Sequence, residues 1–275
     1  MSYQTIMVHL QLWHSNTAVL LAASVLAQRT NAAVIGIVVG LQTQMVYGKS
    51  FAMVDYYDRE QAHIEEKIAA EEKLFRAAFK DHKKPISWRA SIGMQPVENY
   101  IVEQACAADL IITSVHPSDL YDTYNSAHAG EIVMQSGRPV LAVPAHTKQF
   151  KLDNMLIGWK DTRECRRAIM DALPLLALAK RVTLLEIATE YNKQDATLRL
   201  NEVAVWLKSH GVAAVPLVSI SKESDATQLM MEAKKQQADI VITGAYGHSR
   251  FREWMLGGVT NELLQGTHFC AFLSH

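Results

Sequence analysis

The sequence contains an internal repeat, and this feature limits the possible folds more than any other. Residues 108–114 read Ala-Asp-Leu-Ile-Ile-Thr-Ser, and residues 238–244 read Ala-Asp-Ile-Val-Ile-Thr-Gly. Both are short, continuous apolar runs, as is typical of strands that are buried on both faces of a parallel sheet. A copy in each half of the chain predicts two similar units that follow one another.

The same order of elements surrounds each copy, with strands and helices in alternation. The strands expected in the first half are residues 6–10, 32–40, 86–92, 108–114 and 139–143. Those expected in the second half are residues 155–159, 182–187, 212–220, 238–244 and 269–273. The intervening helices are expected at residues 15–29, 59–83, 96–107, 163–180, 195–210, 225–237 and 259–264. This alternation predicts an α/β fold with two tandem, doubly wound parallel sheets.

The domain boundary is expected in the polar segment 144–152, which gives domains at residues 1–147 and 148–275. Domains of this size are common. The last strand of each half is apolar enough to need cover along its edge. We therefore expect the two halves to pack together as an intramolecular pseudo-dimer, and the whole chain has the option of pairing again as a homodimer. A single large sheet is the alternative, although it leaves the repeat without an explanation.

Charge and cysteine content exclude several classes of protein. The formal net charge is −1 at pH 7, so nucleic acid is not expected as a partner. The three cysteines are widely spaced without a C-x-x-C pair, which disfavours a disulfide framework and a zinc site of ordinary spacing. No signal peptide and no apolar run of about 18 residues is present, so a cytoplasmic location away from membranes is expected.

A glycine-rich stretch follows the repeated strand only in the second half. Gly244, Gly247 and Gly257 form a Gly-x2-Gly-x9-Gly pattern before a helix that is expected to start at Val259. Bare glycine backbone and a helix N-terminus both favour a bound phosphate. The spacing matches neither the Walker loop nor the dinucleotide fingerprint. Glycines near a turn also have an alternative interpretation, which is turn geometry alone.

This pattern, placed between an apolar strand and a terminal helix–strand pair, resembles the nucleotide-binding loop of the universal stress protein family. Asp161, just after the first strand of the same half, matches the acidic residue that the family places at the adenosine end of its site. The resemblance covers essentially the whole chain as two tandem domains with the adenine-nucleotide α-hydrolase-like fold. Its motif is strong in the second half and weak in the first.

The resemblance implies a site for ATP or another adenosine phosphate, with Mg²⁺ as an optional companion. In this reading Asp161 lies by the ribose and adenine, Ile187 lines the adenine pocket, and the glycines surround the phosphates. Gly258 stands where the family has Ser or Thr, and loss of that donor weakens binding by about 1.5–3 kcal/mol if nothing replaces it. Thr260 matches a second hydroxyl position. The expected binding residues are Asp161, Ile187, Gly244, Gly247, Gly257, Gly258, Val259 and Thr260.

Asp161 also has a structural interpretation, as the N-cap of the helix that follows it. The first half differs from the second at the matching places, with Gln11 aligned to Asp161, Ser114 to Gly244 and Pro117 to Gly247. Because proline removes a backbone donor, we do not expect the first half to bind ATP in the family manner.

Three histidines of the first half form a second candidate group. His9 and His116 follow or end neighbouring strands, and His128 begins the last helix of the half. Converging imidazoles are able to bind zinc or an anion. The interpretation that we prefer is that these side chains are unrelated, because their spacing is not that of a metal site.

Three functions are compatible with these features. The first is a stress-related regulatory module that binds a nucleotide without fast chemistry of its own. The second is an adaptor that acts through its surface without a nucleotide. The third is a slow ATP-hydrolysing enzyme, but phosphoryl transfer needs a positioned metal and a base or water-orienting group, and no such motif is present. We therefore expect no catalytic residues and rank the regulatory module first.

Overall fold

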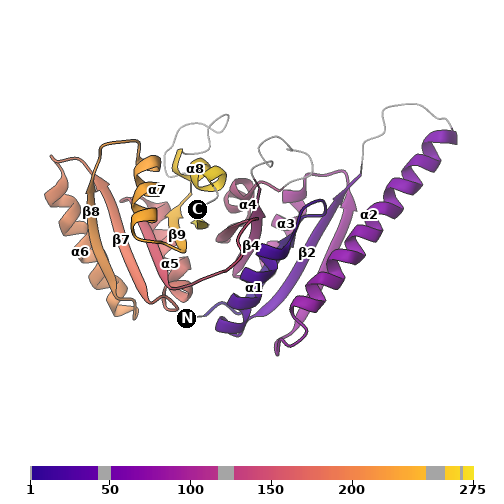
Figure 1. The fold of residues 1–275 in the computed structure, drawn as a ribbon, viewed down its shortest axis with the longest axis horizontal. Coiled ribbons are helices and arrows are strands. Elements are labelled where there is room, and N and C mark those ends of the chain that lie inside the picture. Colours follow the sequence, from indigo (N-terminus) through magenta and orange to yellow (C-terminus); the bar gives the residue numbers. More distant parts are fainter. Residues whose placement is uncertain (1, 43–50, 117–126, 246–257, 267–268) are drawn as a thin grey trace.

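The computed structural model describes residues 2–42, 51–116, 127–245, 258–266 and 269–275, and the statements below refer to these. It contains one ten-stranded sheet with helices on both faces (Figure 1). The strand order is β3-β2-β1-β4-β5-β10-β9-β6-β7-β8. Each half thus supplies five strands in the same order, so the repeat and the single large sheet are both present.

The elements of the first half are β1 (Thr5–Leu10), α1 (Thr17–Thr30), β2 (Ala33–Leu41), α2 (Phe51–Ala78), β3 (Ile86–Gly93), α3 (Val97–Gln104), a short 3₁₀ turn (Ala105–Ala107), β4 (Leu110–Val115), α4 (Ala129–Ser136) and β5 (Val140–Pro144). Those of the second half are β6 (Asn154–Trp159), α5 (Arg163–Leu176), β7 (Arg181–Ala188), α6 (Lys193–Ser209), β8 (Ala214–Ile220), α7 (Asp225–Lys235), β9 (Ile240–Gly244), α8 (Gly258–Gly266) and β10 (Cys270–Ser274). The proposed boundary after residue 147 falls between β5 and β6.

All strand pairs within a half are parallel. The aspartate of the repeated Ala-Asp pair makes the same contacts in both halves. In the first half, the carboxylate of Asp109 accepts hydrogen bonds from the backbone N–H groups of Gln4 and Thr5. Asp239 accepts the equivalent bonds from Asp153 and Asn154. The repeated Ala-Asp pair therefore fixes the start of the central strand in each half.

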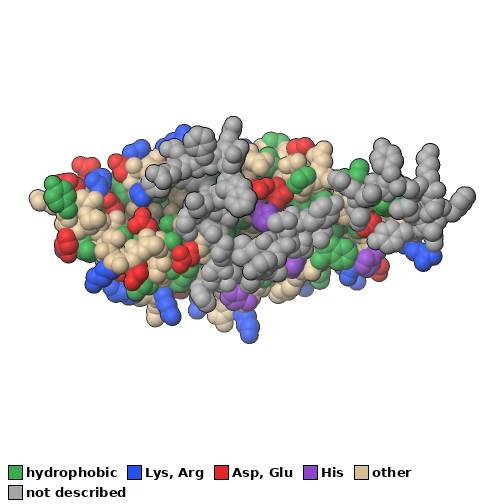
Figure 2. Space-filling view, turned by 90° about the horizontal axis from the view of Figure 1, so that it is seen from above, with side chains coloured by type: hydrophobic (Ala, Val, Ile, Leu, Met, Phe, Trp, Pro, Cys, Tyr) green, Lys and Arg blue, Asp and Glu red, His purple; other side chains and the backbone are tan. Residues whose placement is uncertain are grey.

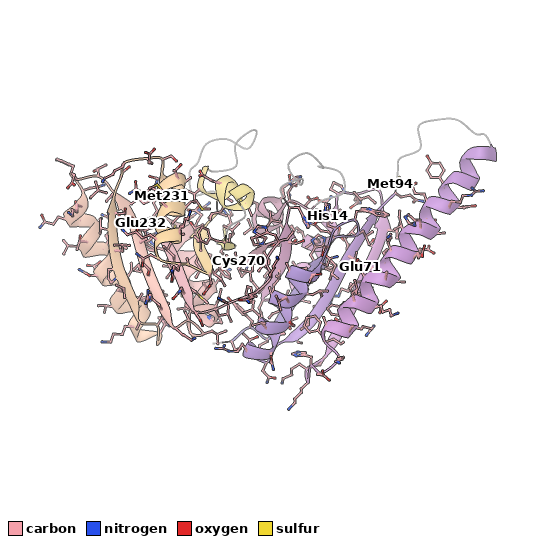
Figure 3. The ribbon with its side chains drawn as sticks, in the orientation of Figure 1. His14, Glu71, Met94, Met231, Glu232 and Cys270 are labelled. Atoms are coloured by element: carbon pink, nitrogen blue, oxygen red, sulfur yellow. The ribbon has the colours of Figure 1, made fainter. Side chains whose placement is uncertain are left out.

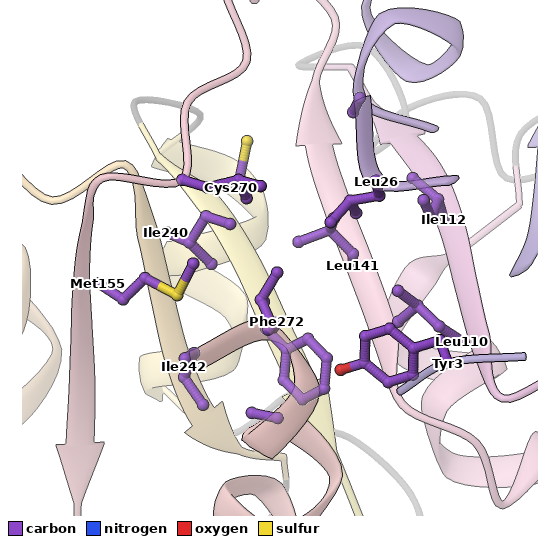
Figure 4. Packing of buried hydrophobic residues seen from close by; sticks show 14 of the residues in the cluster. Tyr3, Leu26, Leu110, Ile112, Leu141, Met155, Ile240, Ile242, Cys270 and Phe272 are labelled. Carbon is purple, nitrogen blue, oxygen red and sulfur yellow. The ribbon is translucent and has the colours of Figure 1, made fainter. Parts of the chain in front are cut away.

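The two halves join where β5 pairs with β10 in antiparallel orientation, with Phe272 opposite Leu141. Figure 4 shows Phe272 with Ile240 and Ile242 of β9 on one side and with Tyr3 and Leu141 of the first half on the other. The hydroxyl of Tyr3 donates to the backbone oxygen of Asp171 on α5, 2.8 Å away. The predicted pairing of the last strands is confirmed, and the pseudo-dimer shares one sheet.

The sheet separates two layers of packing. One hydrophobic cluster joins the sheet to α1, α2, α5 and α6, and its buried residues come from both halves. The other lies on the opposite face, beneath α3, α4, α7 and α8. Helices of each half thus cover both faces, as the doubly wound arrangement requires.

The long helix of the first half differs from its prediction. α2 begins at Phe51, eight positions before the expected start, and ends at Ala78. Ile64 and Phe75 of this helix and Phe79 just after it are buried, whereas Leu74 is 52% exposed.

All three cysteines are free thiols. No helix in the described ranges combines the length and the apolarity that crossing a membrane requires.

Candidate functional site

Each half has one point where the strand order reverses. β1 lies between β2 and β4 in the first half, and β6 lies between β7 and β9 in the second. Ligands of open α/β sheets bind beyond the carboxyl ends of the strands at such points. These ends lie at the upper edge in Figure 1, and Figure 2 views the molecule from that side.

Asp161 follows β6 at this edge, as predicted, and its side chain is 53% exposed. Its carboxylate pairs with Arg166 of α5. The N-cap of α5 is Thr162, whose hydroxyl accepts from the backbone N–H of Cys165 at 3.3 Å. The structural interpretation of Asp161 as the helix cap was therefore wrong, and its side chain is available to other groups at the cost of an exposed ion pair.

Gly244 ends β9 beside the first turn of α5. A Cβ atom at this position would lie 2.6 Å from the backbone nitrogen of Cys165 and 2.6 Å from the carbonyl carbon of Glu164. Helix backbone cannot move aside as a flexible side chain does, so the packing of α5 on β9 requires glycine here. Close approach of α5 thus accounts for one of the predicted loop glycines.

The remaining predicted binding residues are only partly placed. Ile187 of β7 is half-buried and packs on the α3, α4, α7 and α8 face of the sheet. Gly258 opens α8, Val259 is half-buried in its first turn, and Thr260 is 2% exposed. Gly247 and Gly257 belong to the part of the chain that is not described.

A charged pair with a buried carboxylate and a partly exposed guanidinium lies next to Asp161 and was not foreseen. Glu186 of β7 pairs with Arg199 of α6 at 2.5 Å. This bond, aided by the charges of Asp161 and Asp195, raises the pKa of Arg199. An acidic residue within the apolar strand at residues 182–187 was the sequence signal that could have found it.

Three polar atoms of this region lack a hydrogen-bond partner within the described ranges. They are Oε2 of Glu186, Nε of Arg199 and the indole Nε1 of Trp159, and Glu186 and Trp159 are direct neighbours across β6 and β7. Buried polar atoms nearly always have a partner. The carboxyl end of β6 and β7 is therefore a polar, charged region rather than the end of an apolar core.

The first half has a different arrangement at its own reversal point. His9 is fully buried, its Nδ1 lies 2.9 Å from the hydroxyl of Thr113, and burial lowers its pKa to about 4. The ring of His116 stacks on that of His14 with centroids 4.2 Å apart. Burial and the neighbouring His14 lower the pKa of His116 to about 4.

The three histidines of the second candidate group do not form a ligand set. The N-cap of α4 is His128, which donates its backbone N–H to Glu98 at 2.7 Å. Within the described ranges, no group of three His, Cys, Asp or Glu side chains could hold a metal ion. His9 and His116 do lie at the ends of paired strands, as predicted, but each has another neighbour.

Strand register corrects one alignment between the halves. Ile6 pairs with Leu110 as Met155 pairs with Ile240, which aligns Gln11 with Lys160 and Leu12 with Asp161. The alignment of Gln11 with Asp161 was thus displaced by one residue, because the turn before α1 is longer than the turn before α5. Leu12 is buried at 6% exposure. The first half therefore has an apolar side chain where the second has an exposed carboxylate.

Comparisons with known proteins give a match in structure but not in sequence. No protein-family model matches the sequence. No curated protein matches it significantly. A universal stress protein from Archaeoglobus fulgidus DSM 4304 superposes with a TM-score of 0.78 at 11% identity, over 98% of this chain and 95% of that one.

A second solved structure, a functionally unknown protein from Pseudomonas aeruginosa PAO1, superposes with a TM-score of 0.63 at 14% identity. It covers 99% of this chain and 92% of its own. Both matches extend across the two halves and the junction between β5 and β10. At such low sequence identity, they show a shared fold and nothing more. The chain therefore has the fold of a universal stress protein with two tandem domains.

Proposed function

We propose that the second half binds an adenosine phosphate, with ATP as the first candidate, and that the chain acts as a regulatory nucleotide-binding module of a stress response in the cytoplasm. The observation that carries this proposal is that Asp161 and Gly244 both lie at one reversal point of the strand order. The two residues follow or end β6 and β9, which are adjacent strands. A carboxylate that accepts ribose hydroxyls and a bare backbone beside them are what a nucleoside phosphate needs.

The phosphate end of the proposed site involves α8. This helix starts at Gly258 after the loop that leaves β9, and its first turn carries no acidic residue. A helix N-terminus with bare backbone favours an anion. Mg²⁺ would accompany the nucleotide through the phosphates and water, as this ion commonly does.

Calorimetric titration with ATP, ADP and AMP tests the proposal. We expect saturable binding that Asp161→Ala weakens at least about tenfold, since a hydrogen bond to a charged group contributes about 1.5–3 kcal/mol. Asp81→Ala is the matched control, because Asp81 is a fully accessible carboxylate of the first half, with a side chain 89% exposed. Absence of binding at millimolar nucleotide would overturn the proposal.

One observation favours the alternative of an adaptor that works without a nucleotide. The contact between Gly244 and α5 explains this glycine without any ligand. A ligand that binds the native state raises the melting temperature, and the rise grows with the logarithm of the ligand concentration above its Kd. An unchanged melting temperature with all three nucleotides would therefore favour the adaptor.

A further inference from the structure

A cavity lies in the first half, away from the proposed nucleotide site. It occupies about 360 Å³ between α1 and α2, near the turn that follows β1. This volume is at the small end of the range for sites of small molecules. Figure 3 labels His14, at the upper end of α1, and Glu71, on the side of α2 that faces α1.

One end of the cavity is polar and is held in a fixed geometry. The side chain of Asn16 accepts from the backbone N–H of Gln11 at 3.0 Å and donates to the oxygen of the same residue at 2.8 Å. Its amide also donates to one carboxylate oxygen of Glu71, 2.9 Å away. Asn16 is 4% exposed, so it anchors the Glu71 carboxylate from within the protein.

The charge of Glu71 is incompletely balanced. Burial raises the pKa of its carboxyl group, against the opposing effects of Asn16 and of the charge on Lys67. No Lys, Arg or His of the described ranges lies within ion-pair distance of Glu71, and the ammonium of Lys67 lies over the ring of Trp13. A cation beside Glu71 would favour the charged form of this carboxylate, against the effect of its partial burial.

The other end of the cavity is mostly apolar. Its walls are Leu20 and Leu21 of α1 with Leu74 and Ala78 of α2, and the Ser24 hydroxyl beside them donates to the backbone oxygen of Leu21 at 2.9 Å. The hydroxyls of Ser15 and Thr17 lie at the polar end. The Leu74 side chain is partly exposed along this cavity. Glu71 is the one carboxylate among the lining residues.

We propose that this cavity is a binding site for a small primary ammonium ion with a short aliphatic tail. The ammonium donates to the free oxygen of Glu71 and to the hydroxyls of Ser15 and Thr17. The tail lies along Leu20, Leu21 and Leu74. A ligand with a second ammonium at its far end binds more weakly, because that charge would be desolvated against leucine side chains.

The simpler role for Glu71 is to stabilise the N-terminus of α1, which has no side-chain cap bond and no acidic residue in its first turn. Glu71→Gln separates the two roles. The amide oxygen of Gln still accepts from Asn16, but the negative charge is lost. A purely structural role predicts a small change in stability and no effect on amines.

The test is a titration of the full chain with n-butylammonium, followed by the backbone amide NMR signals of residues 14–17 and by calorimetry. We expect saturable shifts, with n-butanol and 1,4-diaminobutane binding at least about tenfold more weakly, as a charge-assisted hydrogen bond implies. Glu71→Gln should weaken n-butylammonium binding to a similar extent. Glu72→Gln is the matched control, because the carboxylate of Glu72 is next to Glu71 in sequence but pairs with Arg76 and does not line the cavity.

Leu74→Ala keeps the test decisive if Glu71→Gln proves poorly folded. This exposed side chain can be shortened safely, and the variant should lose affinity for n-butylammonium while methylammonium binding is unchanged. The proposal is wrong if n-butanol binds as well as n-butylammonium, if Glu71→Gln or Leu74→Ala binds like the wild type, or if no saturable shift occurs at millimolar amine.

Discussion

Gly244 shows how one residue can belong to both the fold and the proposed site. A Cβ atom here would meet the backbone of α5, so Gly244 sets how closely the N-terminus of that helix approaches the end of β9. Asp161 lies in the turn that leads into the same helix. The distance between the two proposed ligand contacts therefore depends on the packing of Gly244.

We expect Gly244→Ala to lower the free energy of unfolding by about 1–3 kcal/mol, which is the usual cost of overpacking. Urea denaturation measures it. Gly93→Ala is the matched control, because Gly93 also ends a strand and a Cβ there has no atom within 4 Å. Equal stability of the two variants would show that α5 shifts freely and that Gly244 does not set its position.

His9 makes the stability of the first half depend on pH. Its pKa is about 4 in the folded protein and is near 6.5 in the unfolded chain, because folding buries the ring. Between these values the unfolded chain binds the proton and the folded protein does not. Stability must therefore fall as the pH decreases from about 6.5 to about 4, by an amount on the order of 3 kcal/mol, and this contribution is constant above and below that range.

His9→Gln removes this titration while leaving an amide near Thr113. We expect the free energy of unfolding of the variant to fall less steeply than that of the wild type over this pH range. Urea denaturation at several pH values gives both slopes. Parallel slopes, or an NMR titration in which His9 protonates near pH 6.5 in the folded protein, would contradict the prediction.

At the scale of elements, the start of α5 distinguishes capping from binding. Thr162 accepts a bond from the Cys165 N–H, whereas Asp161 makes an exposed ion pair. We expect Thr162→Ala to cost about 1 kcal/mol of stability, the usual value for an N-cap. Asp161→Ala should change stability by less than about 0.5 kcal/mol, since exposed pairs contribute little.

Thermal and urea denaturation of the two variants measure this difference. Ser224→Ala is a positive control, because Ser224 caps α7 through the same bond to the residue three positions on. A larger loss from Asp161→Ala than from Thr162→Ala would return Asp161 to a structural role and weaken the proposed site.

The order of the elements could be predicted because each strand is a short apolar run and the Ala-Asp strand recurs in both halves. Solvent-facing details followed less well. Leu74 is exposed because it lines the cavity between α1 and α2, and the spacing of apolar residues along α2 does not reveal this cavity. The acidic residue in the apolar strand marks Glu186, but its partner Arg199 lies 13 residues later on the next helix, and this spacing does not identify the pair.

The candidate site was predicted in part. The placement of Asp161 and Gly244 beyond adjacent strands follows from the repeat together with the rule for carboxyl ends. The alignment of Asp161 with Gln11 was displaced by one residue, because residue types do not show where a strand ends and how long the following turn is. The role of Thr162 rather than Asp161 as the cap is decided by backbone geometry, since both residues are good N-caps.

At the scale of the whole molecule, the ten-stranded sheet makes the two halves depend on each other. Phe272 is completely buried and lies between strands of both halves (Figure 4). Tyr3 of the first half donates to Asp171, and Ser274 donates to the carboxylate of the same residue at 2.6 Å. The bond from Ser274 lies within the second half and fixes Asp171 in place. Two independent domains joined by a flexible linker would have neither the shared strand pair nor the bond from Tyr3 to Asp171.

We therefore expect the chain to unfold in a single transition and Phe272→Ala to lower its stability by about 3–5 kcal/mol, as for other buried Phe truncations. Hydrogen exchange measured by mass spectrometry should show lost protection in both β4 and β9, because β5 and β10 join these strands through one another. Phe75→Ala removes an equally buried ring far from the junction, and its local effect should be confined to the neighbours of α2. If Phe272→Ala exposed β9 while β4 stayed protected, the halves would be separate folding units.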